Sequence, residues 1–125
     1  YEVKNIPRDD QQKRQDWYLQ GVQFFHAPEA IILYVDRSLN AWSILDAGHI
    51  AMLIMLAAQE FGLGTCPQTV PTRYPNVMRR VLGIPESKLI LYSLALGYPD
   101  WNDPVNSLRS PRDPLERFVR WHGFE

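Results

Sequence analysis

The sequence predicts one domain that mixes helices and strands. The chain has 125 residues, which suits a single compact domain. Two short, continuous apolar runs have the length of buried strands, and the longer apolar segment between them has the length of a helix. Apolar residues make up 46% of the chain and charged residues 22%, which is the composition of a globular protein.

The first predicted elements are a helix and a strand. A helix is expected from Gln11 to about Phe25, with Asp9 or Asp10 as its N-cap. Pro28 excludes helix beyond that point. The run from Ala30 to Val35 predicts a strand that is covered on both faces, because its apolar residues are continuous and do not alternate with polar ones.

The segment from Ile44 to about Phe61 is predicted to be a long helix without a polar face. Ser43 and Asp46 resemble a capping box, and Gly62 suits the left-handed position that follows a helix. A helix that is apolar on every side must be buried all round. Because a 125-residue domain has little room for such a helix, a subunit interface is expected to cover the face left open.

The remaining chain contains a loop, a short helix, a second strand and an irregular tail. Residues 62–71 read as a loop, and a helix is expected over Pro75–Leu82, ended by Gly83. Leu89–Leu96 reads as a strand, and a proline-rich tail precedes a short helix over Pro114–Trp121. Since two strands do not make an independent sheet, a partner chain or an upstream segment is expected to add strands.

Charge and residue usage exclude several classes of function. A net charge of −1 gives no support to a nucleic-acid or membrane-surface role. The longest unbroken apolar run, Ile50–Ala58, has nine residues, whereas a membrane-spanning helix needs about 20. The single cysteine predicts a reducing compartment, the cytoplasm. No metal site is expected, because the three histidines are scattered; His49 reads as a core or interface residue.

Two features have binding potential, each with a simpler alternative. The loop "GLGTCPQTVP" lets a flat ligand approach backbone N–H groups closely, or is an ordinary exit from a helix. Cys66 in this loop reads as a buried small hydrophobe rather than a nucleophile, because no base neighbours it in the sequence. Arg109 and Arg112 suit a phosphate, or lie on a solvated surface paired with Asp113 or Glu116.

Five blocks of the sequence together resemble the nitroreductase family of FMN-dependent oxidoreductases. They occur in the family's order between about Ile6 and Gly123: "FFHAPEAIILYVDR", W-x-x-x-D-A-G, "LAAQEFGLGTCPQ", "LGIPESKLILYSLALGYPD" and "VNSLRSPRDPLERF". The resemblance implies an α+β, nitroreductase-like fold that forms an intertwined homodimer around a central buried helix, Ile44–Phe61. It also implies two FMN molecules at the dimer interface, and a C-terminal segment that adds a strand to the partner's sheet.

The resemblance assigns the binding residues. Cys66, Pro67, Gln68 and Thr69 match the positions along the flavin ring, where backbone N–H groups reach toward N5 and O4. Arg112 matches the family's phosphate-binding arginine. Ser110 occupies the position of another basic residue, and Arg109 is the candidate replacement for it. Trp42 and Tyr74 are candidate aromatic residues at the edge of the substrate pocket, and a role in the core is equally open for each.

The resemblance implies a ping-pong enzyme that passes hydride from NAD(P)H through flavin N5 to a small electron-poor acceptor. Nitroaromatics, quinones and enones are the acceptors implied. The sequence matches the C-terminal portion of the usual family length as a single domain, 1–125, and lacks the family's N-terminal arginine motif for the FMN phosphate. One alternative is therefore a truncated, non-catalytic flavin-binding or dimerisation module. Another is a specialised branch, such as a dehalogenase or a flavin-destroying enzyme.

Overall fold

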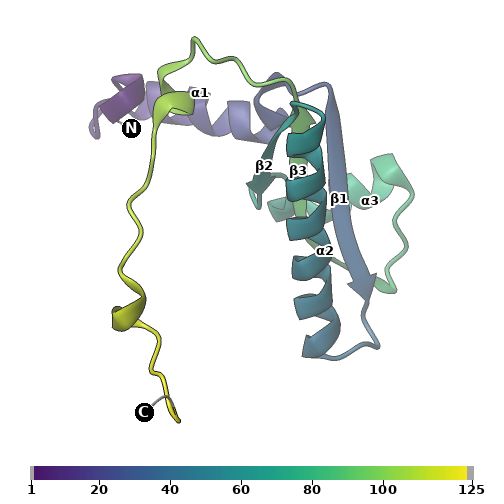
Figure 1. Cartoon of the computed structure of the whole chain (residues 1–125). Helices are drawn as coiled ribbons and strands as arrows, with labels where there is room; N and C mark the ends of the chain where they lie inside the picture. Colours follow the sequence, from purple (N-terminus) through teal and green to yellow (C-terminus); the bar gives the residue numbers. More distant parts are fainter. Residues whose placement is uncertain (1, 124–125) are drawn as a thin grey trace.

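The computed structural model describes residues 2–123 and contains a three-stranded sheet with helices on both faces (Figure 1). Helices and strands follow one another as α1 (Gln11–Val22), β1 (Glu29–Asp36), α2 (Ala41–Glu60), β2 (Gly64–Gln68), α3 (Pro75–Leu82) and β3 (Lys88–Gly97). Short 3₁₀ turns complete the fold: η1 (Glu2–Lys4), η2 (Phe24–His26), η3 (Pro71–Arg73), η4 (Pro104–Ser107) and η5 (Leu115–Arg117).

The sheet has the order β1-β3-β2, and β3 pairs antiparallel with both neighbours. Ser93 of β3 is the partner of Ile32 on one side and of Gln68 on the other. The chain therefore supplies a third strand, β2, where the sequence predicted only a loop. Its residues have low strand propensity, but Pro67 is tolerated because β2 lies at the edge of this sheet, where no N–H donor is needed.

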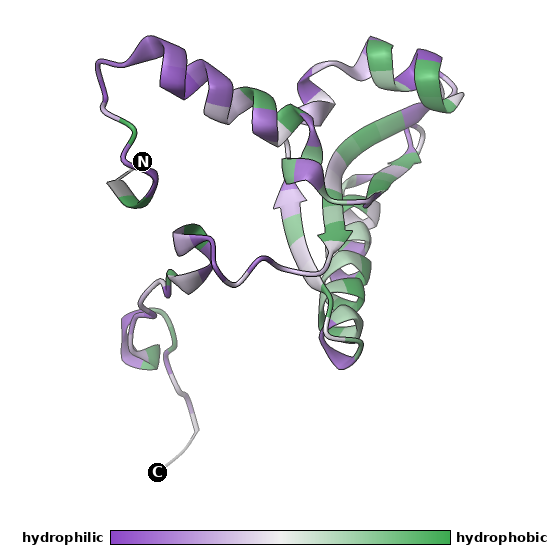
Figure 2. Cartoon of the chain, turned by 90° about the horizontal axis from the view of Figure 1, so that it is seen from above, coloured by the Kyte–Doolittle hydropathy of each residue, from purple (hydrophilic) through white to green (hydrophobic). Residues whose placement is uncertain are grey.

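The core lies between the sheet and α2. Leu33 of β1, Leu94 of β3 and Ala51 of α2 are buried together. Ile54 and Met55 of α2 extend this contact along the same sheet face. The two views agree that α1 and α3 lie on the opposite side of the sheet from α2 (Figures 1 and 2). On that side α1 packs at Gly21 against the side chain of Val70, which lies just after β2.

Several element ends differ from the prediction. α1 ends at Val22, because Phe24, Phe25 and His26 all have positive φ and turn the chain toward β1. α2 begins at Ala41, and the Asn40 side chain, rather than Ser43, caps it by accepting from the Trp42 N–H. The tail has only the three-residue turn η5 where a helix over Pro114–Trp121 was expected.

Other local predictions are confirmed. Asp10 caps α1, and α3 has the predicted bounds and is followed by left-handed Gly83. Gly62 is left-handed after α2, with φ of 68°. The N–H of Gly62 bonds to the Gln59 carbonyl and that of Leu63 to the Ala58 carbonyl, which is the paired arrangement of a Schellman motif.

α2 is not buried all round within this chain, and the expected partner for its open face remains a prediction. It is hydrophobic along most of its length (Figure 2), yet only Ala51 and Ala58 are buried. One sheet face covers only one side of a helix, so the opposite side stays exposed. His49 is among the exposed residues, so a core histidine is the wrong interpretation. The large apolar side chains left exposed on α2 are Trp42, Ile44, Leu45, Ile50, Met52, Leu53 and Leu56.

By length and composition, α2 also resembles a membrane-spanning helix. Among the helices in residues 2–123, α2 alone is long and apolar enough to cross a membrane. The length of the longest unbroken apolar run, nine residues, was too strict a criterion for excluding such a helix. Gly48, His49 and Gln59 interrupt the apolar run, but the helix as a whole stays apolar. A helix from the interior of a soluble protein passes the same test.

Candidate functional site

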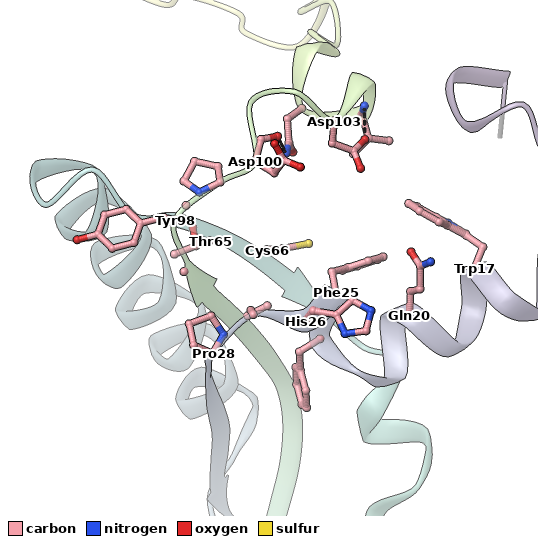
Figure 3. A pocket seen from close by; sticks show the side chains of 18 residues that line it. Trp17, Gln20, Phe25, His26, Pro28, Thr65, Cys66, Tyr98, Asp100 and Asp103 are labelled. Atoms are coloured by element: carbon pink, nitrogen blue, oxygen red, sulfur yellow. Dashed lines mark hydrogen bonds between the residues drawn. The ribbon is translucent and has the colours of Figure 1, made fainter.

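A cleft of about 590 Å³ opens between the end of α1, the start of β2 and the loop after β3 (Figure 3). Such a volume suits a small ligand. One wall comes from α1 and η2 and is largely aromatic; Trp17 and Phe25 stand with ring centroids 5.3 Å apart. Thr65 and Cys66 of β2 contribute a second side, and Asp100 and Asp103 lie on the third.

A strained turn shapes the aromatic wall. Phe24, Phe25 and His26 have φ of 55°, 53° and 61°, the left-handed region that residues other than glycine rarely adopt. Each such residue costs about 1–2 kcal/mol, so the surrounding structure must hold the turn in place. Two backbone bonds contribute to this, from the His26 N–H to the Gln23 carbonyl and from the Ala27 N–H to the Phe24 carbonyl.

Lys4 joins two walls of the cleft. Its ammonium group donates to the Asp103 carboxylate and also lies 5.3 Å from the centre of the Trp17 ring. Asp103 further accepts from the Val105 N–H at 2.9 Å. The bond from Lys4, followed by that from the Val105 N–H, lowers the pKa of Asp103 below its usual value. No local pattern in the sequence predicts this pair, because 99 positions separate the two residues.

Cys66 lines the cleft and is exposed, so its interpretation as a buried hydrophobe is wrong for this chain. Its thiol donates a long hydrogen bond, 3.9 Å, to the Pro67 carbonyl. Among residues 2–123 no basic side chain is hydrogen-bonded to the thiol, so the geometry gives no support to a nucleophile.

Unsatisfied polar groups gather where β2 ends. The Gln68 side chain is only 7% exposed, yet both of its amide atoms lack a hydrogen-bond partner in the described part of the chain. Thr69 follows β2 in a bend, and no acceptor for its N–H is found among residues 2–123. Pro67 has no N–H to offer. A ligand that carries an acceptor would satisfy the Thr69 N–H at this end of the strand.

Arg109 and Arg112 belong to the tail, which runs away from β2 after η4 (Figure 1). Arg109 donates to the carbonyls of Asn106 and Leu108, and Arg112 donates to the carbonyl and hydroxyl of Ser110. Asp113 pairs with Arg117 at 2.8 Å instead of with Arg112. Neither arginine has a carboxylate partner within residues 2–123, so the pairing with Asp113 or Glu116 considered above is not formed.

Trp42 and Tyr74 do not line the cleft. Trp42 is 71% exposed in the first turn of α2 and lies one helix length, roughly 30 Å, from the start of β2. A core role for Trp42 is therefore wrong in this chain. Tyr74 is also exposed, and its hydroxyl lies 3.3 Å from that of Tyr18 on α1. The bond to Tyr18 raises the pKa of Tyr74.

The described residues hold no group of three or more His, Cys, Asp or Glu side chains placed to bind a metal ion. The site offers instead an aromatic cleft and, beside it, a strand edge with unpaired backbone and amide groups. The chemistry that these groups favour is the binding of a flat, polar-edged small molecule.

Comparison with known proteins gives consistent results. The model of the nitroreductase family matches residues 2–98. A 4-nitrobenzoate reductase of Pseudomonas putida is 38% identical over 102 residues, which are 82% of this chain and 45% of that protein.

Solved structures agree with the sequence relatives. The FMN- and NADPH-dependent nitroreductase NfnB of Sphigopyxis sp. strain HMH superposes with a TM-score of 0.94 at 31% identity, over 99% of this chain and 56% of that one. The FMN-dependent NfnB of Mycobacterium smegmatis, solved with NADPH, gives 0.92 at 30% identity, over 98% and 55%. The chain spans about half the length of these relatives.

Proposed function

The chain belongs to the nitroreductase family and has its α+β fold, and from this premise we propose that it binds FMN and serves in the NAD(P)H-dependent reduction of electron-poor aromatic compounds. The single observation that carries the proposal is the end of β2, where the Thr69 N–H and the Gln68 amide lack partners in the positions that match the flavin loop of the family. Relatives named for 4-nitrobenzoate support a nitroaromatic acceptor.

The residues present fit part of an FMN site. An isoalloxazine ring presents alternating acceptors and donors along its polar edge, which suits an unpaired backbone N–H beside an unpaired side-chain amide. In this proposal Thr69 donates from its backbone, Pro67 leaves the strand edge free of a competing donor, and Cys66 packs beside the ring. FMN when bound supplies the hydride chemistry, so that NAD(P)H and the acceptor react in turn.

Arg109 and Arg112 are proposed to hold the FMN phosphate. Each guanidinium group bonds to carbonyl or hydroxyl oxygens of its own tail and carries a positive charge that no carboxylate neutralises in the described residues. Fork-shaped donors of this kind bind phosphate well. Because the tail leaves the body of its own chain (Figure 1), these residues are proposed to act at a site shared with a second subunit.

A homodimer accounts for the exposed side of α2. Its large apolar side chains form a continuous surface too extensive for a stable monomer in water. A membrane is a less suitable environment, because Asp46 and His49 would enter the hydrocarbon region at a considerable cost. Two copies that pack through this surface bury it in both chains at once. Trp42 and Tyr74, both exposed, remain candidates for the edge of the substrate pocket in such a dimer.

The alternative function is a non-catalytic flavin-binding or dimerisation module of the same fold, which would use the exposed α2 surface without hydride transfer.

Visible spectroscopy tests the proposal and separates it from the alternative. The purified protein is titrated with FMN, and then NADPH is added without oxygen. We expect the protein to bind FMN and NADPH to remove the flavin absorbance at about 450 nm, the usual band of an oxidised flavin. The absorbance should return when a nitroaromatic is added. Binding without bleaching favours the module. A protein that dimerises but ignores FMN would contradict flavin binding altogether.

A further inference from the structure

Ser93 is a buried polar residue in the centre of the sheet. It lies on β3 between Tyr92 and Leu94, and its exposed fraction is 0%. A buried hydroxyl is costly unless it is hydrogen-bonded, and the Ser93 hydroxyl donates to the backbone carbonyl of Gln68 at 3.1 Å. The hydroxyl thus adds a side-chain bond between β3 and the last residue of β2, with which Ser93 is already paired.

The bond orients the peptide that follows β2. The Gln68 carbonyl and the Thr69 N–H belong to one planar, trans peptide group and point in opposite directions. Since the carbonyl faces β3, where Ser93 lies, the Thr69 N–H faces away from β3, toward the open edge of the sheet. No acceptor for this N–H is present among residues 2–123, so it is directed outward and unused.

The same peptide lies where the sheet stops holding the chain. β2 ends at Gln68, and Val70 already has helical φ and ψ of −61° and −48°. The next carbonyl, that of Thr69, accepts from the Thr72 hydroxyl at 2.8 Å. Two side-chain hydroxyl groups therefore hold the peptides on either side of Thr69. The pairing of Gln68 with Ser93 turns the Gln68 carbonyl toward β3, and the Ser93 hydroxyl adds a further bond that keeps it there.

We propose that Ser93 is a positioning residue for the flavin: by holding the Gln68 carbonyl, it aims the Thr69 N–H at the N5 atom of bound FMN. This inference rests on the proposed function. Ser93 does not touch the flavin itself, because it is fully buried on β3, the central strand of the sheet. Its effect is to keep one donor oriented before the ligand arrives, which reduces the reorganisation that binding requires.

A comparison of two flavins isolates this role. In 5-deaza-FMN a C–H group replaces N5, so the ring keeps its shape but loses the acceptor. Ser93→Ala is expected to weaken FMN binding by about threefold to tenfold, the effect of one hydrogen bond, and to change 5-deaza-FMN binding by less than about twofold. Ser93→Thr, which keeps the hydroxyl, is expected to restore the preference for FMN. If Ser93→Ala does not fold, Ser93→Cys, with its weaker donor, replaces it.

Leu33→Val is the matched control, because it alters a buried side chain of the same sheet on the strand farthest from β2. It is expected to lower the unfolding temperature without separating the two flavins. Equal weakening of both flavins by Ser93→Ala, or no weakening of either, would overturn the role of Ser93. A wild-type protein that binds neither flavin would instead overturn the proposed function, and this inference with it.

Discussion

Replacing Leu53 of α2 by alanine is expected to weaken self-association with little effect on the folded single chain. Alanine favours helix, and the Leu53 side chain is 62% exposed, so little packing within the chain is lost. Complete burial of a leucine side chain stabilises by about 1.5–3 kcal/mol. Because 62% of Leu53 is still exposed, its burial against a partner would contribute about 1–2 kcal/mol. In a two-fold dimer each substitution counts twice, giving about 2–4 kcal/mol.

That free energy corresponds to a dissociation constant for the dimer raised by about 30-fold to 700-fold. Analytical ultracentrifugation over a concentration series measures it directly. Val81→Ala is the matched control, because Val81 is 70% exposed on a different helix, α3, and is not part of the α2 surface. Equal dissociation constants for the wild type and Leu53→Ala, or a wild type that is monomeric throughout, would refute an interface formed by α2.

Three further substitutions test the fold. Gly97→Ala places a Cβ 2.8 Å from the ring of Pro28, so about 1–3 kcal/mol of unfolding free energy should be lost in urea titrations; an unchanged midpoint would contradict the packing. Arg79→Met removes bonds of 2.6 Å to two backbone carbonyls between α3 and β3 and should cost about 2–4 kcal/mol, with Arg80→Met, on the exposed side, as a near-neutral control. Asp36→Asn tests the pH dependence of stability. Hydrogen bonds from Ser38 and then from Lys88 lower the pKa of Asp36. The stabilisation by this carboxylate is therefore present above the usual pKa of 3.8 and is lost as the pH falls below it. The difference in thermal midpoint between wild type and Asp36→Asn should therefore narrow in acid. A difference that stays constant with pH would show that the Asp36 carboxylate does not contribute to the pH dependence of stability.

Short-range signals predicted the elements whose formation depends on their own residues. Pro75 and Gly83 delimit α3, and Gly62 ends α2 in the left-handed conformation. The continuous apolar runs became β1 and β3, each extended slightly at its ends. These signals act within a few positions of the chain, through φ restrictions, helix caps and apolar patterns, so a single sequence contains them in readable form.

Long-range contacts produced the features that the patterns did not predict. β2 is a strand because β3 pairs with it, although Pro67 and the small residues around it are typical of a loop. Arg79, in the last turn of α3, is buried and donates to the carbonyls of Pro85 and Lys88. Burial of this kind depends on what packs nearby, and the spacing of residues within α3 does not reveal it.

In the candidate site, too, the sequence predicted some features and the tertiary structure decided the others. The matching blocks of sequence were sufficient to place Cys66, Gln68 and Thr69 in one segment and to assign the family, which the comparisons confirm. The order of residues does not contain directions in space, and the direction of a peptide group decides what it binds. Folding supplies that direction: β3 pairs with β2 and brings Ser93 beside Gln68, 25 positions away in sequence, so that the Thr69 N–H faces outward.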